Sequence, residues 1–240
     1  MLKIIFTIKY FKMKNYLLLL VFVLVVACQQ PNSEKDKDDK EQNKIVTLSD
    51  KIAQANGLDQ WNEVDSLTYE FIVEMKGETV AKRKWSWKPG LDEVTMLDTA
   101  IDSLESITYN RAEKENFKEI DQKFINDQYW LIYPFHLVWD DDIKKSVKED
   151  VEAPISGKKM TELTVKYSDK KGYTPGDTYK VYVDGDYMIR EWSYIPQGSA
   201  EPRMSTTWED YIDPNGIKMA TAHQNEDGSF RIYFDNISLN

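Results

Sequence analysis

Two histidines and a run of three aspartates are the residues best suited to acid–base or metal chemistry in this sequence. His136 and His223 titrate near neutral pH, as a general acid or base must. Neither accompanies a nucleophile motif such as G-x-S-x-G, so we predict no catalytic residue. We expect His136, inside an apolar run, to be a core residue and His223 to lie on a sheet surface. An enzyme acting on envelope material, with His136 and Asp140 as its pair, is an alternative.

The aspartate run, Asp140 to Asp142, offers carboxylate oxygens of the kind that bind Ca²⁺. The D-x-D-x-D-G spacing of a calcium loop is absent, so we expect a solvated acidic loop and no metal site. Gly-rich phosphate loops such as G-x-G-x-x-G are absent too, and the sequence therefore predicts no cofactor.

Aromatic residues are the more promising binding groups, because their faces bind lipids, sugars or peptide strands. The chain has seven tryptophans, and core packing accounts for most of them in a curved sheet. We expect some to line the mouth or wall of a pocket for an apolar ligand. The candidate ligand-binding residues are Trp130, Phe135, Trp139, Trp85 and Trp87.

The single cysteine, Cys28, follows an apolar run that ends at Ala27. The run is shorter than the about 20 residues that span a bilayer, and lysines precede it, as in a secretory signal. Residues 1–27 are therefore predicted to be a signal peptide, with its start at Met1 or Met13. The sequence before and including Cys28 resembles a bacterial lipobox. This implies acylation of Cys28, palmitate included, and attachment to a membrane through lipid.

Residues 28–44 are dominated by charged and polar side chains after Cys28, so we expect a flexible tether. Residues 45–240 have the length of one domain. With 31 Lys and Arg against 41 Asp and Glu, the formal net charge is −10, which argues against a nucleic-acid partner. One cysteine excludes a disulfide framework, and two histidines cannot form a three-histidine metal centre.

The elements that would position these residues follow from two hydrophobic periods. A short helix is expected over residues 48–57, with Ser49 as its cap and Gly57 at its end. From Leu67 onward, apolar residues alternate with polar ones and turns recur between the runs, which predicts hairpin-linked strands. Thr174 to Asp177 predicts a type II turn, and Asp184-Gly185 predicts a two-residue hairpin turn.

The middle of the chain differs. Residues 114–127 have helical spacing, and residues 129–139 form an apolar run interrupted by Pro134. We expect this segment to pack against the concave face of the sheet, either filling it or covering it. The predicted fold is mainly β (α+β): a curved antiparallel sheet or incomplete up-and-down β-barrel, with a short N-terminal helix and a helical mid-chain segment on the concave face.

Several stretches resemble the LolA and LolB group of lipoprotein-sorting proteins. They are Asn56-Gly57-Leu58, Trp61, Val183 to Trp192, Trp208 to Tyr211, Asn215 to Met219 and Ile237 to Asn240. The resemblance implies a LolA-like half-barrel over residues 45–240. Residues 124–127, 129–131 and 134–140 also resemble a Bacteroidetes family of lipoproteins.

Together these patterns predict a non-enzymatic lipoprotein of the cell envelope, anchored by lipid in the outer membrane. It would act as a monomer and bind an acyl chain or another lipid in its concave sheet. A surface adaptor or structural lipoprotein with a filled barrel is the alternative.

Overall fold

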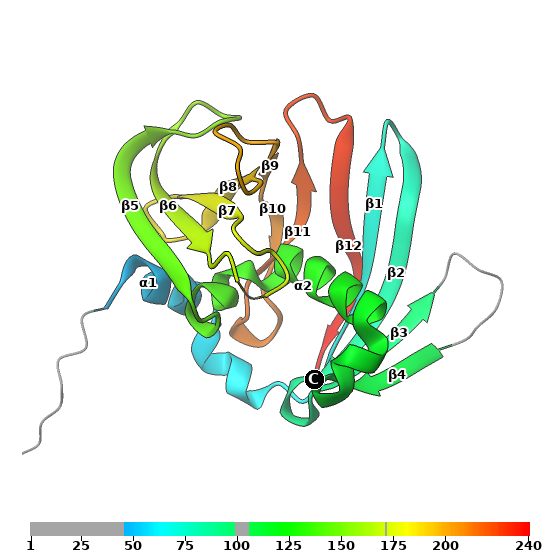
Figure 1. Cartoon of the computed structure of the whole chain (residues 1–240). Helices are drawn as coiled ribbons and strands as arrows, with labels where there is room; N and C mark the ends of the chain where they lie inside the picture. Colours follow the sequence, from blue (N-terminus) through cyan, green and yellow to red (C-terminus); the bar gives the residue numbers. More distant parts are fainter. Residues whose placement is uncertain (1–45, 99–105, 171) are drawn as a thin grey trace, which may run out of the picture. The chain divides into compact units, whose positions relative to one another are not determined.

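The chain folds into two antiparallel sheets with a long helix packed against them (Figure 1). The computed structural model describes residues 46–98, 106–170 and 172–240, which belong to one compact unit. The predicted signal, Cys28 and the tether lie outside the described residues. Within the described part, no helix has the length and apolarity needed to cross a membrane.

The larger sheet has seven strands, and the first and last strands of the chain pair at its centre, with Leu67 opposite Leu239. In sheet order, the strands are β10 (Glu209–Ile212), β11 (Met219–Gln224), β12 (Phe230–Leu239), β1 (Leu67–Met75), β2 (Glu78–Lys88), β3 (Glu93–Asp98) and β4 (Ser106–Asn110).

The smaller sheet has five strands that follow one another along the chain. They are β5 (Ile143–Glu152), β6 (Lys159–Tyr167), β7 (Thr178–Val183), β8 (Ile189–Ile195) and β9 (Met204–Thr207). The expected type II turn joins β6 to β7: Gly176 has a φ of 77°, and Asp177 N donates to Thr174 O at 3.2 Å.

Trp208 marks the point where one strand passes between the two sheets. It separates β9, which pairs with β8, from β10, which pairs with β11. Its backbone N–H still donates to Arg190 O at 2.8 Å, so the strand leaves the smaller sheet only after this residue. Residues 204–212 therefore form two strands, one in each sheet. The two sheets form a curved, unclosed arrangement that confirms the predicted fold class.

The short helix α1 (Leu48–Ala55) is present, but its cap is Thr47 and not Ser49. Thr47 and Asp50 form a capping box, whereas Ser49 is buried. Gly57 ends the segment at a φ of 90°, as expected. A Cβ on this residue would lie 2.1 Å from the carbonyl oxygen of Gly216, so glycine is required there.

The hairpin turn at Asp184 is longer than the predicted two residues. Asp184 N donates to Met188 O, and Tyr187 takes a φ of 61°. A three-residue loop of this kind adds a residue in the left-handed region and a bulge. The four remaining helical turns are 3₁₀ segments: Leu58–Glu63, Pro89–Leu91, Arg111–Phe117 and Pro214–Gly216.

The long helix α2 (Lys118–Trp139) includes most of the segment with helical spacing and all of the apolar run. Pro134 lies inside it. Because proline has no N–H and its ring crowds the preceding turn, the helix is kinked, and Ile132 has φ −124° and ψ 26°. Leu131, Phe135 and Leu137 are each 1% exposed. The helix therefore packs on the concave face as predicted.

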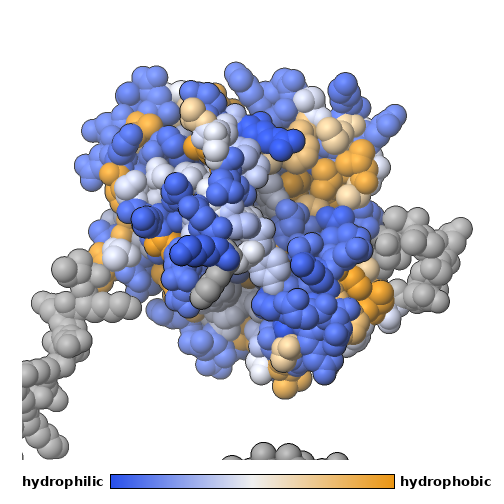
Figure 2. All heavy atoms as spheres, in the orientation of Figure 1, coloured by the Kyte–Doolittle hydropathy of each residue, from blue (hydrophilic) through white to orange (hydrophobic). Residues whose placement is uncertain are grey.

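Sequence periodicity did not reveal β4 and β5. Strand β5 is charged on both faces and mostly exposed, so no apolar alternation marks it. It is the edge of the smaller sheet, where charged side chains discourage pairing with other chains. Figure 2 shows a mostly hydrophilic face, with apolar residues at the far end of β1 and β2, where Met75 and Val80 are exposed.

Candidate functional site: two cavities beside the central helix

Two cavities lie beside α2, and residues on one side of the helix border one cavity or the other. Tyr129, Tyr133, His136 and the helix-ending Asp140 follow one another at spacings of three and four residues. Residues at these spacings project from one side of a helix. This side faces the smaller sheet and the loop between β6 and β7.

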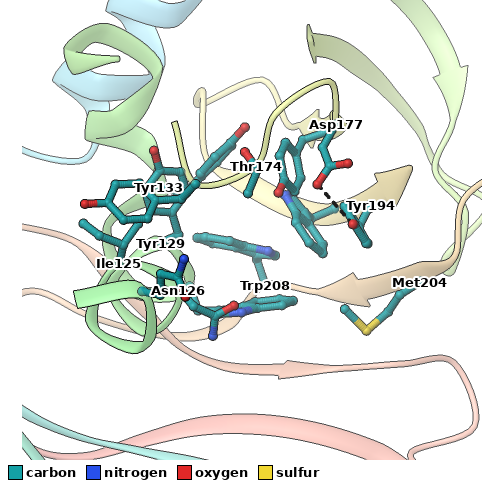
Figure 3. Close-up of a pocket in the computed structure, with 14 residues that line it drawn as sticks. Ile125, Asn126, Tyr129, Tyr133, Thr174, Asp177, Tyr194, Met204 and Trp208 are labelled. Atoms are coloured by element: carbon teal, nitrogen blue, oxygen red, sulfur yellow. Dashed lines mark hydrogen bonds between the residues drawn. The ribbon is translucent and has the colours of Figure 1, made fainter. Parts of the chain in front are cut away.

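The first cavity has a volume of about 530 Å³ and lies between α2, the loop after β6 and strands β7 to β9 (Figure 3). Aromatic side chains form most of its wall. They are Tyr129, Trp130 and Tyr133 from the helix, Tyr173 from the loop, Tyr179, Trp192 and Tyr194 from the strands, and Trp208 from the link between β9 and β10. Ile125 and Met204 add apolar surface, so this cavity is suited to an apolar ligand.

The strand side of this cavity is built from stacked rings. Tyr179 on β7 lies opposite Tyr194 on β8, and their ring centroids are 5.5 Å apart. Trp192 stacks on Tyr179 at 5.3 Å, and Trp130 of α2 packs against Trp192 at 4.6 Å. Contacts between aromatic rings at these distances hold the wall in one geometry.

A carboxylate fixes the outer part of the same wall. Asp177 accepts hydrogen bonds from the Tyr194 hydroxyl at 3.1 Å and from the Gln197 backbone N–H at 2.9 Å. Figure 3 shows Asp177 and Tyr194 facing each other across this bond. The first cavity therefore has polar groups at its edge and aromatic rings along its side.

The second cavity, of about 520 Å³, adjoins the first because Ile125, Tyr129, Tyr173 and Thr174 border both. Its other lining residues are more polar. They include Arg111, His136, Asp140, Asp141, Asp142 and Ser168, together with the indole rings of Trp87 and Trp139.

Asp140 is the centre of hydrogen bonding in the second cavity. It accepts bonds from His136 Nδ1 at 2.9 Å, from the Tyr167 hydroxyl at 2.8 Å and from the Tyr129 hydroxyl. Burial by itself would raise the pKa of Asp140. The bonds and charge of His136, with the two tyrosine hydroxyls, instead hold the pKa below its usual value. Asp140 is therefore a carboxylate that holds Tyr129, Tyr167 and His136 in place.

His136 and Asp140 thus lie within hydrogen-bond distance, as the enzyme alternative requires. His136 is buried, as expected for a core histidine, and stacks on Tyr129 at 3.8 Å. Its Nε2 has no hydrogen-bond partner among the described residues, so none of their hydroxyl groups is hydrogen-bonded to it as a nucleophile would be. The pair has the geometry of an orienting contact and lacks a third catalytic member there.

The expected binding residues are divided between the cavities and the core. Trp130 borders the first cavity, and Trp87 and Trp139 border the second. Phe135 is 1% exposed and packs against Trp61 at 5.2 Å without lining either cavity. Trp139 is the only one of the five with substantial exposure, at 37%.

Trp85 belongs to a buried polar contact. Its Nε1 donates to Asp127 Oδ2 at 2.8 Å, and Arg83 binds both oxygens of the same carboxylate at 2.7 Å. Burial raises the pKa of Asp127, and the bonds and charge of Arg83 offset part of that effect. Trp85 lines neither cavity, and its side chain ties β2 to α2.

The expectation that His223 lies on a sheet surface is wrong. His223 is fully buried, and its ring packs against Trp208 at 4.5 Å and Trp130 at 5.3 Å. Burial lowers the pKa of His223 to about 3, although backbone groups of Thr207 and Trp130 favour the charged form. Strand β11 is covered on both sides here, so alternation does not report exposure.

The acidic run does not assemble into a cation site. Asp141 and Asp142 are exposed, while Asp140 is engaged by the hydroxyls and His136. Among the residues that the structure describes, no group of three His, Cys, Asp or Glu side chains is arranged to hold a metal ion.

Sequence reasoning missed the tyrosines of the first cavity. Tyr179 and Tyr194 lie in strands that alternation did predict, but a strand pattern does not say which neighbour its inward face meets. The signal that could have found them is the concentration of aromatic residues on the inward face of two consecutive strands.

No protein-family model and no curated protein matches the sequence. Among solved structures, the chain is similar to a LolA superfamily protein from Nitrosomonas europaea, with 7% identity, a TM-score of 0.47, and coverage of 81% of this chain and 94% of that one. It is also similar to a DUF1329 family protein from Desulfovibrio piger, with 10% identity, a TM-score of 0.44, and coverage of 80% and 92%.

A third similar structure is a putative outer membrane lipoprotein-sorting protein domain from Vibrio parahaemolyticus, with 13% identity, a TM-score of 0.43, and coverage of 79% and 91%. Likeness at these values assigns neither a family nor a function to this chain. What the fold and the site define is a mainly β domain whose internal helix leaves an aromatic cavity beside the smaller sheet.

Proposed function

We propose that this chain is a non-enzymatic, lipid-anchored lipoprotein of the cell envelope that binds an acyl chain or similar apolar ligand in the first cavity. The observation that carries the proposal is the aromatic cavity of about 530 Å³ between α2 and strands β7 to β9. Anchoring through Cys28 in the outer membrane, and action as a monomer, rest on the sequence alone.

The size and chemistry of the cavity support this role. Its volume falls within the range of about 300–1,000 Å³ that is typical of small-molecule sites. Burial of apolar surface contributes about 25 cal/mol per Å², so a chain of methylene groups would bind here without any charged partner. Trp130, expected to bind ligand, packs on the stacked wall through Trp192.

The second cavity extends the first, and in this proposal Trp87 and Trp139 contact the part of a ligand that reaches past Tyr129. Phe135 and Trp85 act at a distance, because their side chains hold α2 against the sheets and do not border either cavity.

Uptake of a fluorescent fatty acid, followed by titration, tests the proposal. We expect saturable binding by the full-length protein and a several-fold weaker affinity for Tyr194→Ala, which opens the stacked wall. Tyr187→Ala is the matched control, since Tyr187 is 37% exposed and lines neither cavity. Absence of saturable uptake, or equal loss in both variants, would reject the proposal.

A structural or adaptor lipoprotein is the second candidate, and one observation favours it: α2 packs against the sheets with Leu131, Phe135 and Leu137 almost fully buried. In that case the cavities are packing defects, the probe does not bind, and chemical crosslinking in intact cells recovers a protein partner.

A further inference from the structure

The second cavity combines aromatic rings with carboxylates. Five of its lining residues carry tryptophan or tyrosine rings: Trp87, Trp139, Tyr129, Tyr167 and Tyr173. Trp139 and Tyr173 are 37% and 38% exposed, so part of this ring surface is accessible from solvent. The faces of such rings attract cations as well as apolar groups, because their π-electrons give them a negative potential.

Contacts between rings hold the two indoles beside the same space. Trp87 and Trp139 both pack on Trp61, with ring centroids 5.5 Å and 5.3 Å from it. His136 then connects Trp139 to the helix side of the cavity, since its ring lies 5.5 Å from Trp139 and stacks on Tyr129 at 3.8 Å. The wall is therefore a continuous series of aromatic contacts.

The charges that border this cavity are mainly negative. Asp140 is already engaged, because the Tyr129 and Tyr167 hydroxyls both donate to its Oδ2. Asp141 and Asp142 are exposed, and neither side chain has a hydrogen bond or ion pair to another described residue. They follow the C-terminal end of α2, where the helix dipole also favours a cation.

The positive side chain that borders the cavity is already compensated. Arg111 Nε donates to Asp121 Oδ1 at 3.0 Å, and Arg111 Nη1 lies 3.5 Å from Asp92 Oδ1. Among the described lining residues there is no other Lys or Arg. An anion in the cavity would therefore be repelled by two carboxylates that lack partners, whereas a cation would be attracted by them. The first cavity differs, because its carboxylate, Asp177, accepts a hydrogen bond from Tyr194.

We propose that the second cavity binds an organic ammonium group against the rings of Trp87 and Trp139, with Asp141 and Asp142 as its counter-charges. Aromatic rings are the groups that recognise alkylated ammonium ions in proteins. The proposal goes beyond the function proposed above, because it gives the second cavity a ligand chemistry that needs no acyl chain. The ammonium group belongs to a free amine or to a lipid headgroup, whose tail could pass Tyr129 into the first cavity.

Choline and its neutral isostere 3,3-dimethylbutan-1-ol test the charge while the shape stays constant. Each is titrated into the full-length protein, and the indole signals are followed in a ¹H–¹⁵N spectrum. The Trp139 signal is assigned by its loss in Trp139→Phe. We expect choline to bind about tenfold more tightly than the isostere and to shift this signal. Equal affinities, or an unmoved Trp139 signal, would overturn the proposal.

Variants at the two kinds of group sharpen the test. Trp139→Leu should weaken choline binding about tenfold, and Trp139→Phe should weaken it less, because a ring remains but an indole binds cations best. Asp142→Asn should weaken binding several-fold at low salt, with a smaller difference at high salt. Asp186→Asn is the matched control, since Asp186 is exposed and lines neither cavity. Equal losses in the two Asp→Asn variants would contradict the proposal.

A cation with a tail separates the two sources of the ammonium group. Decyltrimethylammonium carries the head of choline on an apolar chain and is used below its micellar concentration. Binding about tenfold tighter than choline, with displacement of the fluorescent fatty acid, would indicate a lipid headgroup. Equal affinity without displacement would indicate a free amine. Uptake of the fatty acid without choline binding would reject the ammonium site and leave the proposed function standing, and choline binding without uptake would do the reverse.

Discussion

Two buried polar regions flank α2, and they differ in whether their polar atoms have hydrogen-bond partners. Beside β2, the carboxylate of Asp127 is saturated by Arg83 and Trp85. Beside β9, the indole of Trp208 and the hydroxyl of Thr206 are buried and unpartnered. The first region has the completeness of a structural contact. In the second region, the described residues supply no partner for the Trp208 N–H or the Thr206 hydroxyl.

The contrast also separates the tryptophans by role. Trp85 and Trp208 are equally buried, yet only Trp208 borders a cavity. Burial alone therefore does not distinguish these two tryptophans, whereas the hydrogen-bond partner of the N–H does.

Asp127→Ala should break the saturated region most severely. Removing one partner of a buried ion pair costs about 3–5 kcal/mol, because the other charge is left without compensation. Arg83 and the Trp85 N–H would both lose their acceptor. Urea unfolding measures the change. Asp127→Asn, which keeps an acceptor and the shape, should lose less, and equal losses would contradict this account.

His223 places a pH dependence beside the unsaturated region. Its pKa is about 3 in the folded chain and near 6.5 when unfolded. The unfolded state therefore binds a proton between these values that the folded state does not. Stability should fall as pH drops from about 6.5 toward 3, by up to about 1.4 kcal/mol per pH unit from this group.

The His223→Gln variant isolates that contribution, because the carboxylates titrate in both proteins. We expect the difference in unfolding free energy between variant and wild type to change with pH over this window and to be flat above pH 7. A difference that is constant from pH 4 to pH 8 would show that His223 is not buried as a neutral ring.

The fate of His223 shows what the sequence could and could not predict. Alternation correctly predicted the strands and the type II turn at Gly176, because both are local. Alternation predicted that His223 lies on a surface, because the pattern of one strand does not show whether its second face is also covered. Both faces of β11 are covered. The helical mid-chain segment was predicted, but its continuation through Pro134 was not, since burial of Phe135 and Leu137 outweighs the local preference for a break.

The candidate site was predictable only in part, for a related reason. Trp130 was found because an apolar run with aromatic residues stands out in the sequence. The unpartnered state of Trp208 could not be predicted, because it depends on where a strand end and a helix distant in sequence meet. Hydrogen-bond deficits are properties of the assembled fold.

A matched pair of ring substitutions should quantify the contrast. Trp85→Phe and Trp208→Phe remove the same part of an indole from almost fully buried sites. Only the first also removes a hydrogen bond to a carboxylate, which contributes about 1.5–3 kcal/mol. Without ligand, Trp85→Phe should therefore be the more destabilising by about that amount in thermal or urea unfolding. Similar losses would mean that the Trp208 N–H is already paired in solution.

The smallest effect is expected at Thr206, and it tests the same deficit without changing a ring. Thr206→Val replaces an unpartnered buried hydroxyl by a methyl group of similar size. Because the hydroxyl gains nothing from the fold in return for its lost hydration, the variant should be within about 0.5 kcal/mol of the wild type, or more stable. Thr164→Val is the control, since the Thr164 hydroxyl donates to Glu162 at 2.9 Å, and it should lose about 1 kcal/mol. If Thr206→Val is the more destabilising of the two, its hydroxyl has a partner in the free protein. The polar groups beside β9 would then have hydrogen-bond partners, as those around Asp127 do.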